Sequence, residues 1–212
     1  MVELLEVFGD DLTVVNAARV SFAKESHYLS GGDARLIQYL ADHNHITPFF
    51  HPQARFRLKM PIFVAREWFR HQIGFARNEI SRRYVDSDPE FWLPTELRER
   101  DINKKQGSKD TIISNNEYCI DMMQKHNQQS LSLYRFLLNN KVCPEQARAV
   151  LPQCMMTEFI ETGSLAAYAR LYKLRTDPNA QREIQDLASS VGELLAERFP
   201  ISWSALTSCE VE

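Results

Sequence analysis

The segment 53–60 constrains the fold most, because apolar and polar side chains alternate along it without a break. One face carries Ala54, Phe56, Leu58 and Met60. A period of two is typical of a strand that buries one side. Residues 155–162 alternate in the same way, so a second strand is expected there. The chain should therefore contain a sheet as well as helices.

Helical patterns nevertheless cover more of the chain than strand patterns. Pro61 suits the first position of a helix, which we expect to run to about His71. Helices are also expected over 12–20, capped by Asp10 or Asp11, and over 34–43, capped by Asp33. The longest helix, amphipathic with Met122, Met123, Leu131, Leu133 and Leu137, is expected over 116–139, with others over 144–151, 164–174, 179–199 and near Trp203.

The remaining segments complete an α+β pattern in which helices dominate. We expect an edge strand over 2–7, a loop over 74–78, a short extended piece over 81–85 and a surface excursion over 86–109. The chain has 212 residues and shows neither an internal repeat nor a flexible linker. This predicts a single domain spanning residues 1–212, with room for two lobes.

Composition indicates where such a chain works. No apolar run approaches the roughly 20 residues that span a bilayer, so no membrane partner is expected. The first ten residues are acidic, unlike a secretory signal. The four cysteines, at positions 119, 143, 154 and 209, are scattered, so we expect reduced thiols. The predicted location is the cytoplasm, or the host cytoplasm if the source is viral.

Arginines concentrate between residues 66 and 83. The stretch holds five arginines and two glutamates, a net charge of +3, inside a chain whose net charge is −3. An acidic chain is not typical of a general nucleic-acid binder. Arginines on one helix are usually a solvated face, but here a donor-rich segment containing glycine follows. Because guanidinium groups match phosphate and carboxylate oxygens, the block favours a site for a polyanionic small molecule.

The segment 70–84, RHQIGFARNEISRRY, resembles the signature of flavin-dependent thymidylate synthases, in which RHR is followed by a spacer, serine, arginine and tyrosine. Other similar segments follow the same order along nearly the whole chain. They are ARVSF at 18–22, HNHITPF at 43–49, PIFVAR at 61–66, ARAVLP at 147–152, LRTD at 174–177 and AQ at 180–181. Each is weak alone, but their order and spacing together are specific.

Several positions depart from that family's pattern. Gln72 replaces the last arginine of RHR, and the spacer before Ser81 is one residue longer than usual. Glu67 stands where glutamine is common. Arg170 stands where asparagine is frequent, and Asn179 where some members have histidine. These departures bear on individual contacts rather than on the family.

The resemblance implies a helix-rich α+β fold with a small antiparallel sheet, and the reductive methylation of dUMP to dTMP. In this family 5,10-methylenetetrahydrofolate supplies the carbon, NADPH reduces bound FAD, and the reduced FAD supplies a hydride. Because the cofactors perform the difficult chemistry, the role of the protein is to position and polarise the bound molecules. Family members are homotetramers whose sites draw on several subunits.

The resemblance also implies the residues of two sites. The dUMP site would contain Glu67, Arg70, Glu79, Ile80, Ser81, Arg82, Arg83, Arg148 and Arg175. The FAD site would contain Thr47, Arg70, His71, Gln72, Glu79, Ser164 and Arg170. Arg175 would be the catalytic residue, since the family's arginine at this position stabilises negative charge on the uracil ring.

Other interpretations of the reactive side chains are weaker. Cys154 ends an LPQC segment similar to the nucleophile of cysteine-dependent thymidylate synthases, but no histidine follows it, which favours an inert thiol. His43, His45 and His51 lack companion ligands, so no metal is expected. Ser81 has no activating base at a fixed spacing, which favours binding over nucleophilic attack. A nucleic-acid-binding module and a structural subunit stay open as alternatives, and bound flavin would exclude both.

Overall fold

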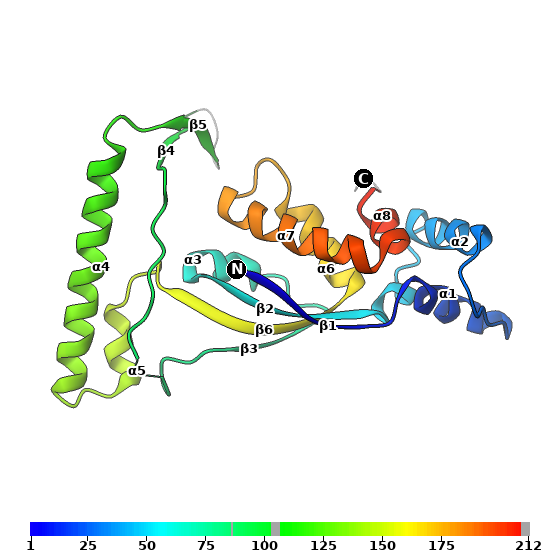
Figure 1. The fold of residues 1–212 in the computed structure, drawn as a ribbon, viewed down its shortest axis with the longest axis horizontal. Helices are drawn as coiled ribbons and strands as arrows, with labels where there is room; N and C mark the ends of the chain where they lie inside the picture. The colour runs from blue at the N-terminus through cyan, green and yellow to red at the C-terminus, as the bar shows by residue number, and fades with distance from the viewer. Residues whose placement is uncertain (86, 103–106, 209–212) are drawn as a thin grey trace. The chain divides into compact units, whose positions relative to one another are not determined.

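The computed structural model describes residues 1–85, 87–102 and 107–208. They form two compact units (Figure 1). Unit 1 comprises Met1–Leu58, Trp68–Asn78 and the described part of Ile160–Glu212, and unit 2 comprises Lys59–Glu67 and Glu79–Phe159. The single domain expected over residues 1–212 stays a prediction, and Cys209 lies outside the described residues.

Four strands form the principal sheet, in the order β1-β2-β6-β3. Their bounds are β1 Val2–Phe8, β2 Gln53–Pro61, β6 Met156–Ser164 and β3 Phe75–Glu79. β1 pairs antiparallel with β2 at the edge of the sheet, with a register shift between Leu4 and Glu6. Ala54, Phe56, Leu58 and Met60 are all buried, as the alternation predicts. The small antiparallel sheet and the α+β class are confirmed.

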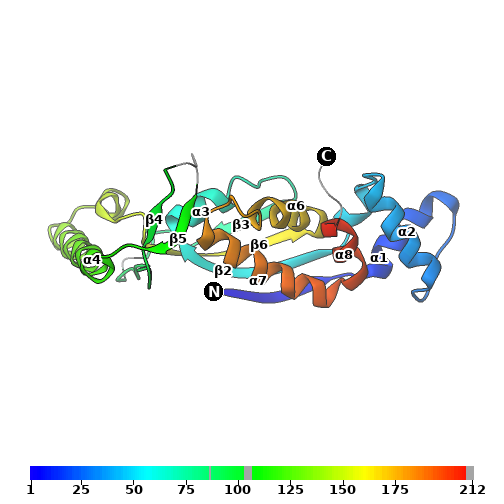
Figure 2. The same cartoon turned by 90° about the horizontal axis from the view of Figure 1, so that it is seen from above.

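Unit 1 covers its part of the sheet with helices. They are α1 (Asp11–Arg19), α2 (Gly31–Asp42), α6 (Leu165–Arg175), α7 (Arg182–Arg198) and α8 (Pro200–Ser208), with 3-10 turns η1 (Val20–Phe22) and η2 (Thr47–Phe50). α6, α7 and α8 pack against one another, and α7 lies along β1 (Figures 1 and 2). α6 also packs against η2, which brings two segments of the predicted FAD site together.

Unit 2 is built around one long helix. Its helical elements are α3 (Ile62–Trp68, whose last residue belongs to unit 1), α4 (Asn116–Asn139), α5 (Pro144–Ala147) and η3 (Arg148–Val150), beside a hairpin of β4 (Arg98–Arg100) and β5 (Ser108–Ile112). α4 matches its predicted bounds and packs against α5 and η3. The prediction of its buried face is partly wrong. Met122 and Leu133 are exposed, while Asn127, Ser130 and Tyr134 are buried. Among the helices of the described residues, none has the length and apolarity needed to cross a membrane.

Several predicted boundaries are wrong near the arginine block. Pro61 ends β2 instead of opening a helix, and α3 stops at Trp68 instead of His71. The segment predicted as a loop over 74–78 is mostly strand β3, and residues 81–85 form a turn instead of an extended piece. Pairing within the sheet outweighs the local glycine and polar signals here, as tertiary contacts commonly do. The later helices differ less: 144–151 divides into α5 and η3, and α7 begins at Arg182.

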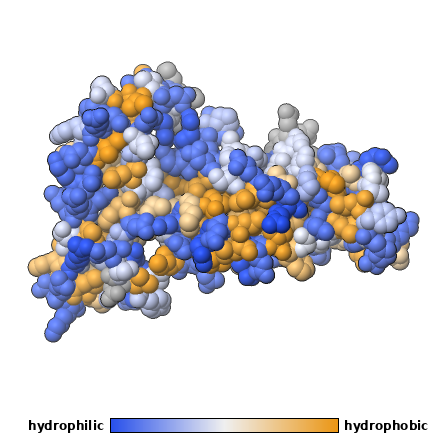
Figure 3. Space-filling model, viewed as in Figure 1, coloured by the Kyte–Doolittle hydropathy of each residue, from blue (hydrophilic) through white to orange (hydrophobic). Residues whose placement is uncertain are grey.

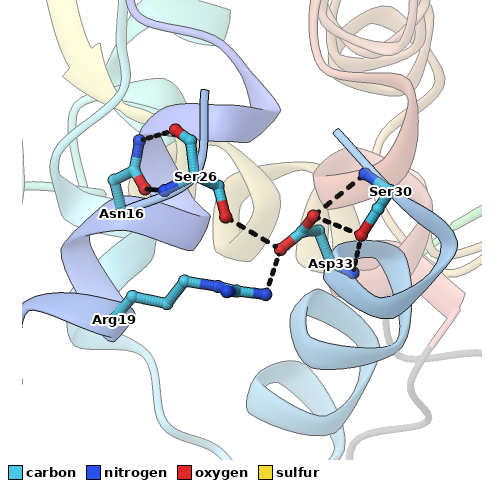
Figure 4. A network of polar contacts seen from close by, with 5 residues as sticks. All are labelled: Asn16, Arg19, Ser26, Ser30 and Asp33. Carbon is cyan, nitrogen blue, oxygen red and sulfur yellow. Dashed lines mark hydrogen bonds and ion pairs between the residues drawn. The ribbon is translucent and has the colours of Figure 1, made fainter. Parts of the chain in front are cut away.

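Asp33 holds the start of α2 from inside the helix, although the sequence suggested it as the cap. Ser30 is the N-cap, and Asp33 completes a capping box with it. The Asp33 carboxylate also accepts from Arg19 Nη2 at 2.5 Å and from Ser26 Oγ at 3.4 Å (Figure 4). Asp33 is only 2% exposed. Through these bonds its buried carboxylate connects the end of α1 to the start of α2.

Candidate functional site

In unit 1, the turn after α3 is held by the N-terminal half of α6. Ser164, the N-cap of α6, donates its backbone N–H to the Gly74 carbonyl at 3.1 Å. Arg170 donates through Nη2 to the Ile73 carbonyl at 2.7 Å. Gly74 has φ +85, and a Cβ there would lie 2.8 Å from the Ala167 Cβ, so the turn needs glycine for both backbone and space. The structure thus brings Ser164 and Arg170 to the segment that carries Arg70, His71 and Gln72.

His71 is the centre of a positively charged cluster in unit 1. Arg175 Nε, on the last residue of α6, lies 2.9 Å from His71 Nε2. The pKa of His71 is lowered to about 4, first by burial and then by the charges of Arg175, Arg77, Arg170 and Arg70. The imidazole is therefore neutral at pH 7 and accepts a hydrogen bond from Arg175. Several guanidinium groups around a neutral ring suit an anionic ligand such as a diphosphate.

Thr47 belongs to the same region of unit 1 through η2. It opens this 3-10 turn, which packs against α6. The Arg170 guanidinium lies 6.0 Å from the ring centroid of Phe50, and Leu165 donates its N–H to the Pro52 carbonyl at 3.0 Å. Of the predicted FAD residues, Thr47, His71, Ser164 and Arg170 thus lie on elements that contact one another. The hydrogen-bond donors of this set fit the phosphates of FAD.

In unit 2, the predicted phosphate-binding residues form a turn after β3. The Ser81 hydroxyl accepts from the Arg83 N–H at 3.2 Å, and the Ser81 carbonyl accepts from the Tyr84 N–H at 3.0 Å. Arg82 donates through Nη1 to the Ser87 carbonyl. Ser81 therefore shapes the turn and leaves the exposed Arg83 side chain to project from it.

Glu145 connects two arginines of the predicted dUMP site. Its carboxylate accepts from Arg83 Nε at 2.8 Å, and its backbone carbonyl accepts from Arg148 Nε at 3.2 Å. Arg83 and Arg148 are far apart in sequence, yet both bond to this one residue at the start of α5. No sequence pattern identifies Glu145, because its contact depends on how α5 meets the 81–85 turn.

Glu79 and Ile80, two other predicted members of this set, bond to residues at the start of β6. Thr157 donates its hydroxyl to Glu79 Oε1 at 2.5 Å, which fixes the direction of that carboxylate. The Ile80 N–H donates to the Glu158 carbonyl at 2.9 Å. Glu67 lies on α3, half-exposed. Arg70 and Arg175 belong to unit 1, whereas the rest of the predicted dUMP set belongs to unit 2.

The alternative reactive groups gain no support from the geometry. Cys154 donates to Asn127 Oδ1 at 3.1 Å, and burial raises the pKa of its thiol, which opposes formation of the nucleophilic thiolate. His43 contacts the Tyr39 carbonyl through Nδ1 at 2.9 Å, and its ring lies 4.0 Å from that of Tyr39. In the described parts of the chain, no group of three or more histidine, cysteine, aspartate or glutamate residues is placed to hold a metal ion.

Comparison with known proteins gives the class that this fold and these sites define. Residues 3–201 match the family Thy1, described as thymidylate synthase complementing protein. The chain belongs to this family. A flavin-dependent thymidylate synthase of Thermus thermophilus is 39% identical over 204 residues, covering 96% of this chain and 74% of the relative. One from Thermosipho melanesiensis is 38% identical over 198 residues, covering 93% and 86%.

A solved structure agrees with the relatives on the fold. The UMP/dUMP methylase PolB from Streptomyces cacaoi, bound with 5-Br dUMP, superposes with a TM-score of 0.88 and 29% sequence identity. The match covers 98% of this chain and 94% of that one. The family resemblance and the fold class are thereby confirmed.

Proposed function

We propose that this chain is a flavin-dependent thymidylate synthase that methylates dUMP to dTMP. FAD is its cofactor, with NADPH and 5,10-methylenetetrahydrofolate as the other substrates. The observation that carries the proposal is the His71 cluster of unit 1, in a chain that belongs to the Thy1 family from residue 3 to residue 201. When bound, FAD would supply the hydride that completes the new methyl group.

For FAD, we propose contacts from Thr47, Arg70, His71, Gln72, Glu79, Ser164 and Arg170. The arginines and the Ser164 hydroxyl suit phosphate and ribose oxygens. His71, being neutral, can accept from Arg175 while its other ring nitrogen donates to a ligand. The residues of the chain thus bind and orient the cofactor without a change of protonation near neutral pH.

For dUMP, we propose that Ser81, Arg83 and Arg148 bind the phosphate, beside Glu67, Glu79, Ile80 and Arg82, and Arg70 is a further member of the proposed set. Arg83 and Arg148 both bond to Glu145, Arg83 to its carboxylate and Arg148 to its backbone carbonyl, so this one residue holds two cations of the proposed phosphate site. Arg175 would stabilise the negative charge that develops on the uracil ring, which requires a fixed donor rather than a mobile one. Its contact with His71 supplies such a restraint.

We further propose a homotetramer in which several subunits complete each site. Large apolar side chains are exposed along one face of α4, namely Tyr118, Met122, Leu133 and Phe136. Apolar surface of this kind (orange in Figure 3) commonly marks contact with another protein chain. The free thiols of Cys119, Cys143 and Cys154 support a reducing compartment, for which we propose the cytoplasm.

The decisive experiment is an assay of the purified protein with each component omitted in turn. We expect yellow protein that releases flavin on denaturation and forms dTMP only when NADPH and methylenetetrahydrofolate are both present. UMP is the matched comparison substrate, because the PolB structure is described as a UMP/dUMP methylase. A colourless protein that neither takes up FAD nor rescues a thymidine-requiring cell would contradict the proposal. Light scattering on a sizing column tests the tetramer.

A further inference from the structure

The buried carboxylate of Glu161 binds two residues that lie on either side of the turn after α3. Glu161 lies on β6 and is fully buried. Trp68 Nε1 lies 3.1 Å from both of its carboxylate oxygens. Arg77, on β3, donates through Nε to Glu161 Oε2. One carboxylate therefore joins the last residue of α3 to the third residue of β3.

The segment between these two donors, residues 69–76, carries Arg70, His71 and Gln72. Its ends are packed as well as hydrogen-bonded. The Arg77 guanidinium lies 5.3 Å from the ring centroid of Phe69 and 4.7 Å from that of Phe75. Ser164 and Arg170 hold the middle of the segment through the Gly74 and Ile73 carbonyls. Glu161 holds the residues that flank its two ends.

A buried carboxylate in this position is costly unless its partners are kept. Burial raises the pKa of Glu161, while the charge of Arg77 and the indole N–H of Trp68 favour the ionised form. Apolar residues could fill a core position on β6 without that cost. The carboxylate instead fixes the geometry, because the Trp68 and Arg77 donors must both keep their direction toward one acceptor.

We propose that Glu161 is a positioning residue that clamps Trp68 to Arg77 and so presets segment 69–76 for FAD. It does not touch the ligand and acts only through the geometry of the turn. The inference rests on the proposed flavin site, since that is what gives segment 69–76 its function. It goes beyond the site because neither Glu161 nor Trp68 is among the residues assigned to it.

The test compares Glu161→Gln with Asp33→Asn in the full-length protein. Both changes replace a buried carboxylate, paired with an arginine in unit 1, by an amide of the same shape. FAD affinity is measured by flavin fluorescence titration, and backbone order by hydrogen exchange of residues 69–76. In Glu161→Gln we expect FAD affinity to fall by about tenfold or more, since small displacements of binding groups have large effects. Exchange over 69–76 should also rise.

The controls keep the outcomes distinct. Asp33→Asn should lower the unfolding temperature but leave both FAD affinity and exchange over 69–76 at wild-type values. Trp68→Phe keeps the Arg77 pair and loses the indole N–H together with part of the buried ring. It should show a smaller loss of affinity than Glu161→Gln, and it serves if Glu161→Gln does not fold. Unchanged affinity and exchange in both Glu161→Gln and Trp68→Phe would overturn the clamp. If wild-type protein took up no FAD, the proposed function would fail, whereas exchange over 69–76 would still decide whether Glu161 orders the segment.

Discussion

Arg175 Nε lies 2.9 Å from His71 Nε2, so the end of α6 is joined to the turn that follows α3. A guanidinium can only donate, so His71 accepts through Nε2 and carries its proton on Nδ1. This contact needs a neutral imidazole, which the lowered pKa of about 4 provides. It also fixes the direction of Arg175, the residue expected to act on the uracil ring.

Replacing Arg175 by alanine should nearly abolish turnover. Removing one preorganised donor from a developing negative charge costs about 10²–10³ in rate. Arg175→Ala should remain folded and yellow, because Ser164 and Arg170 still hold the turn at Gly74 and Ile73. Arg175→Lys should recover little activity, since a lysine lacks the planar fork. The measurement is kcat at saturating dUMP beside flavin absorbance. Near-normal turnover in Arg175→Ala would show that this assignment is wrong.

His71 should titrate near pH 4 in the folded protein. NMR measures this titration, and the resonance that is missing from the spectrum of His71→Gln identifies His71. The folded pKa lies below the unfolded value of about 6.5, so the unfolded state takes up the proton first. The contribution to stability is therefore complete above pH 6.5 and is lost as pH falls toward 4. Arg175→Ala should raise the pKa of His71 only in part, because burial is the larger cause. A folded His71 that titrated at 6.5 would contradict the neutral-ring interpretation.

Arg83→Ala should raise KM for dUMP with little change in kcat. Losing a charge-assisted hydrogen bond costs about 1.5–3 kcal/mol, or roughly tenfold to a hundredfold in affinity. Glu145→Gln is the informative partner, because it releases Arg83 from its ion pair without removing the cation. Its KM should equal that of the wild type or fall slightly, since exposed ion pairs contribute only about 0–1 kcal/mol. Equal KM values for Arg83→Ala and wild type would remove Arg83 from the phosphate site.

Cys154→Ala should retain activity. The thiol bonds to Asn127 and its pKa is raised by burial, so it has no role as a nucleophile. Stability should decrease by about 1 kcal/mol, because Asn127 loses a weak donor and some packing is lost. Turnover and urea unfolding measure the two effects separately. Complete loss of activity in a folded, flavin-loaded Cys154→Ala protein would revive the nucleophile.

Elements with a clear periodicity in their own side chains could be predicted from the sequence. Elements that form only by pairing with a distant segment could not. The alternation of β2 and the long run of α4 sufficed to place both. Residues 75–79 look polar and irregular, and become a strand only through the sheet. Motif spacing could name Arg83 and Arg148 but not Glu145, which lies between them in space. The alternation of β6 places Glu161 on the same strand face as Thr157 and Phe159. Nothing in the local sequence identifies Trp68 and Arg77 as its partners.

Gly163→Ala should destabilise the protein and weaken FAD binding together. A Cβ at Gly163 would lie 2.5 Å from atoms of the Phe75 ring and 2.9 Å from the Tyr168 ring. The Tyr168 ring is fully buried and Phe75 is half-buried, and the two rings meet edge to face with 4.9 Å between their centroids. The added methyl group must therefore displace Phe75, the residue next to Gly74 in segment 69–76. Overpacking of this kind costs about 1–3 kcal/mol.

The matched control for that substitution is Gly31→Ala. Gly31 is the first residue of α2, and a Cβ there would meet nothing within 4 Å. Because alanine favours a helix over glycine, Gly31→Ala should leave stability unchanged or raise it by up to about 1 kcal/mol. Chemical unfolding and flavin titration on both variants separate local crowding from a general effect of losing glycine. If Gly163→Ala bound FAD with wild-type affinity despite its lower stability, the position of the Phe75 ring would not control the flavin segment.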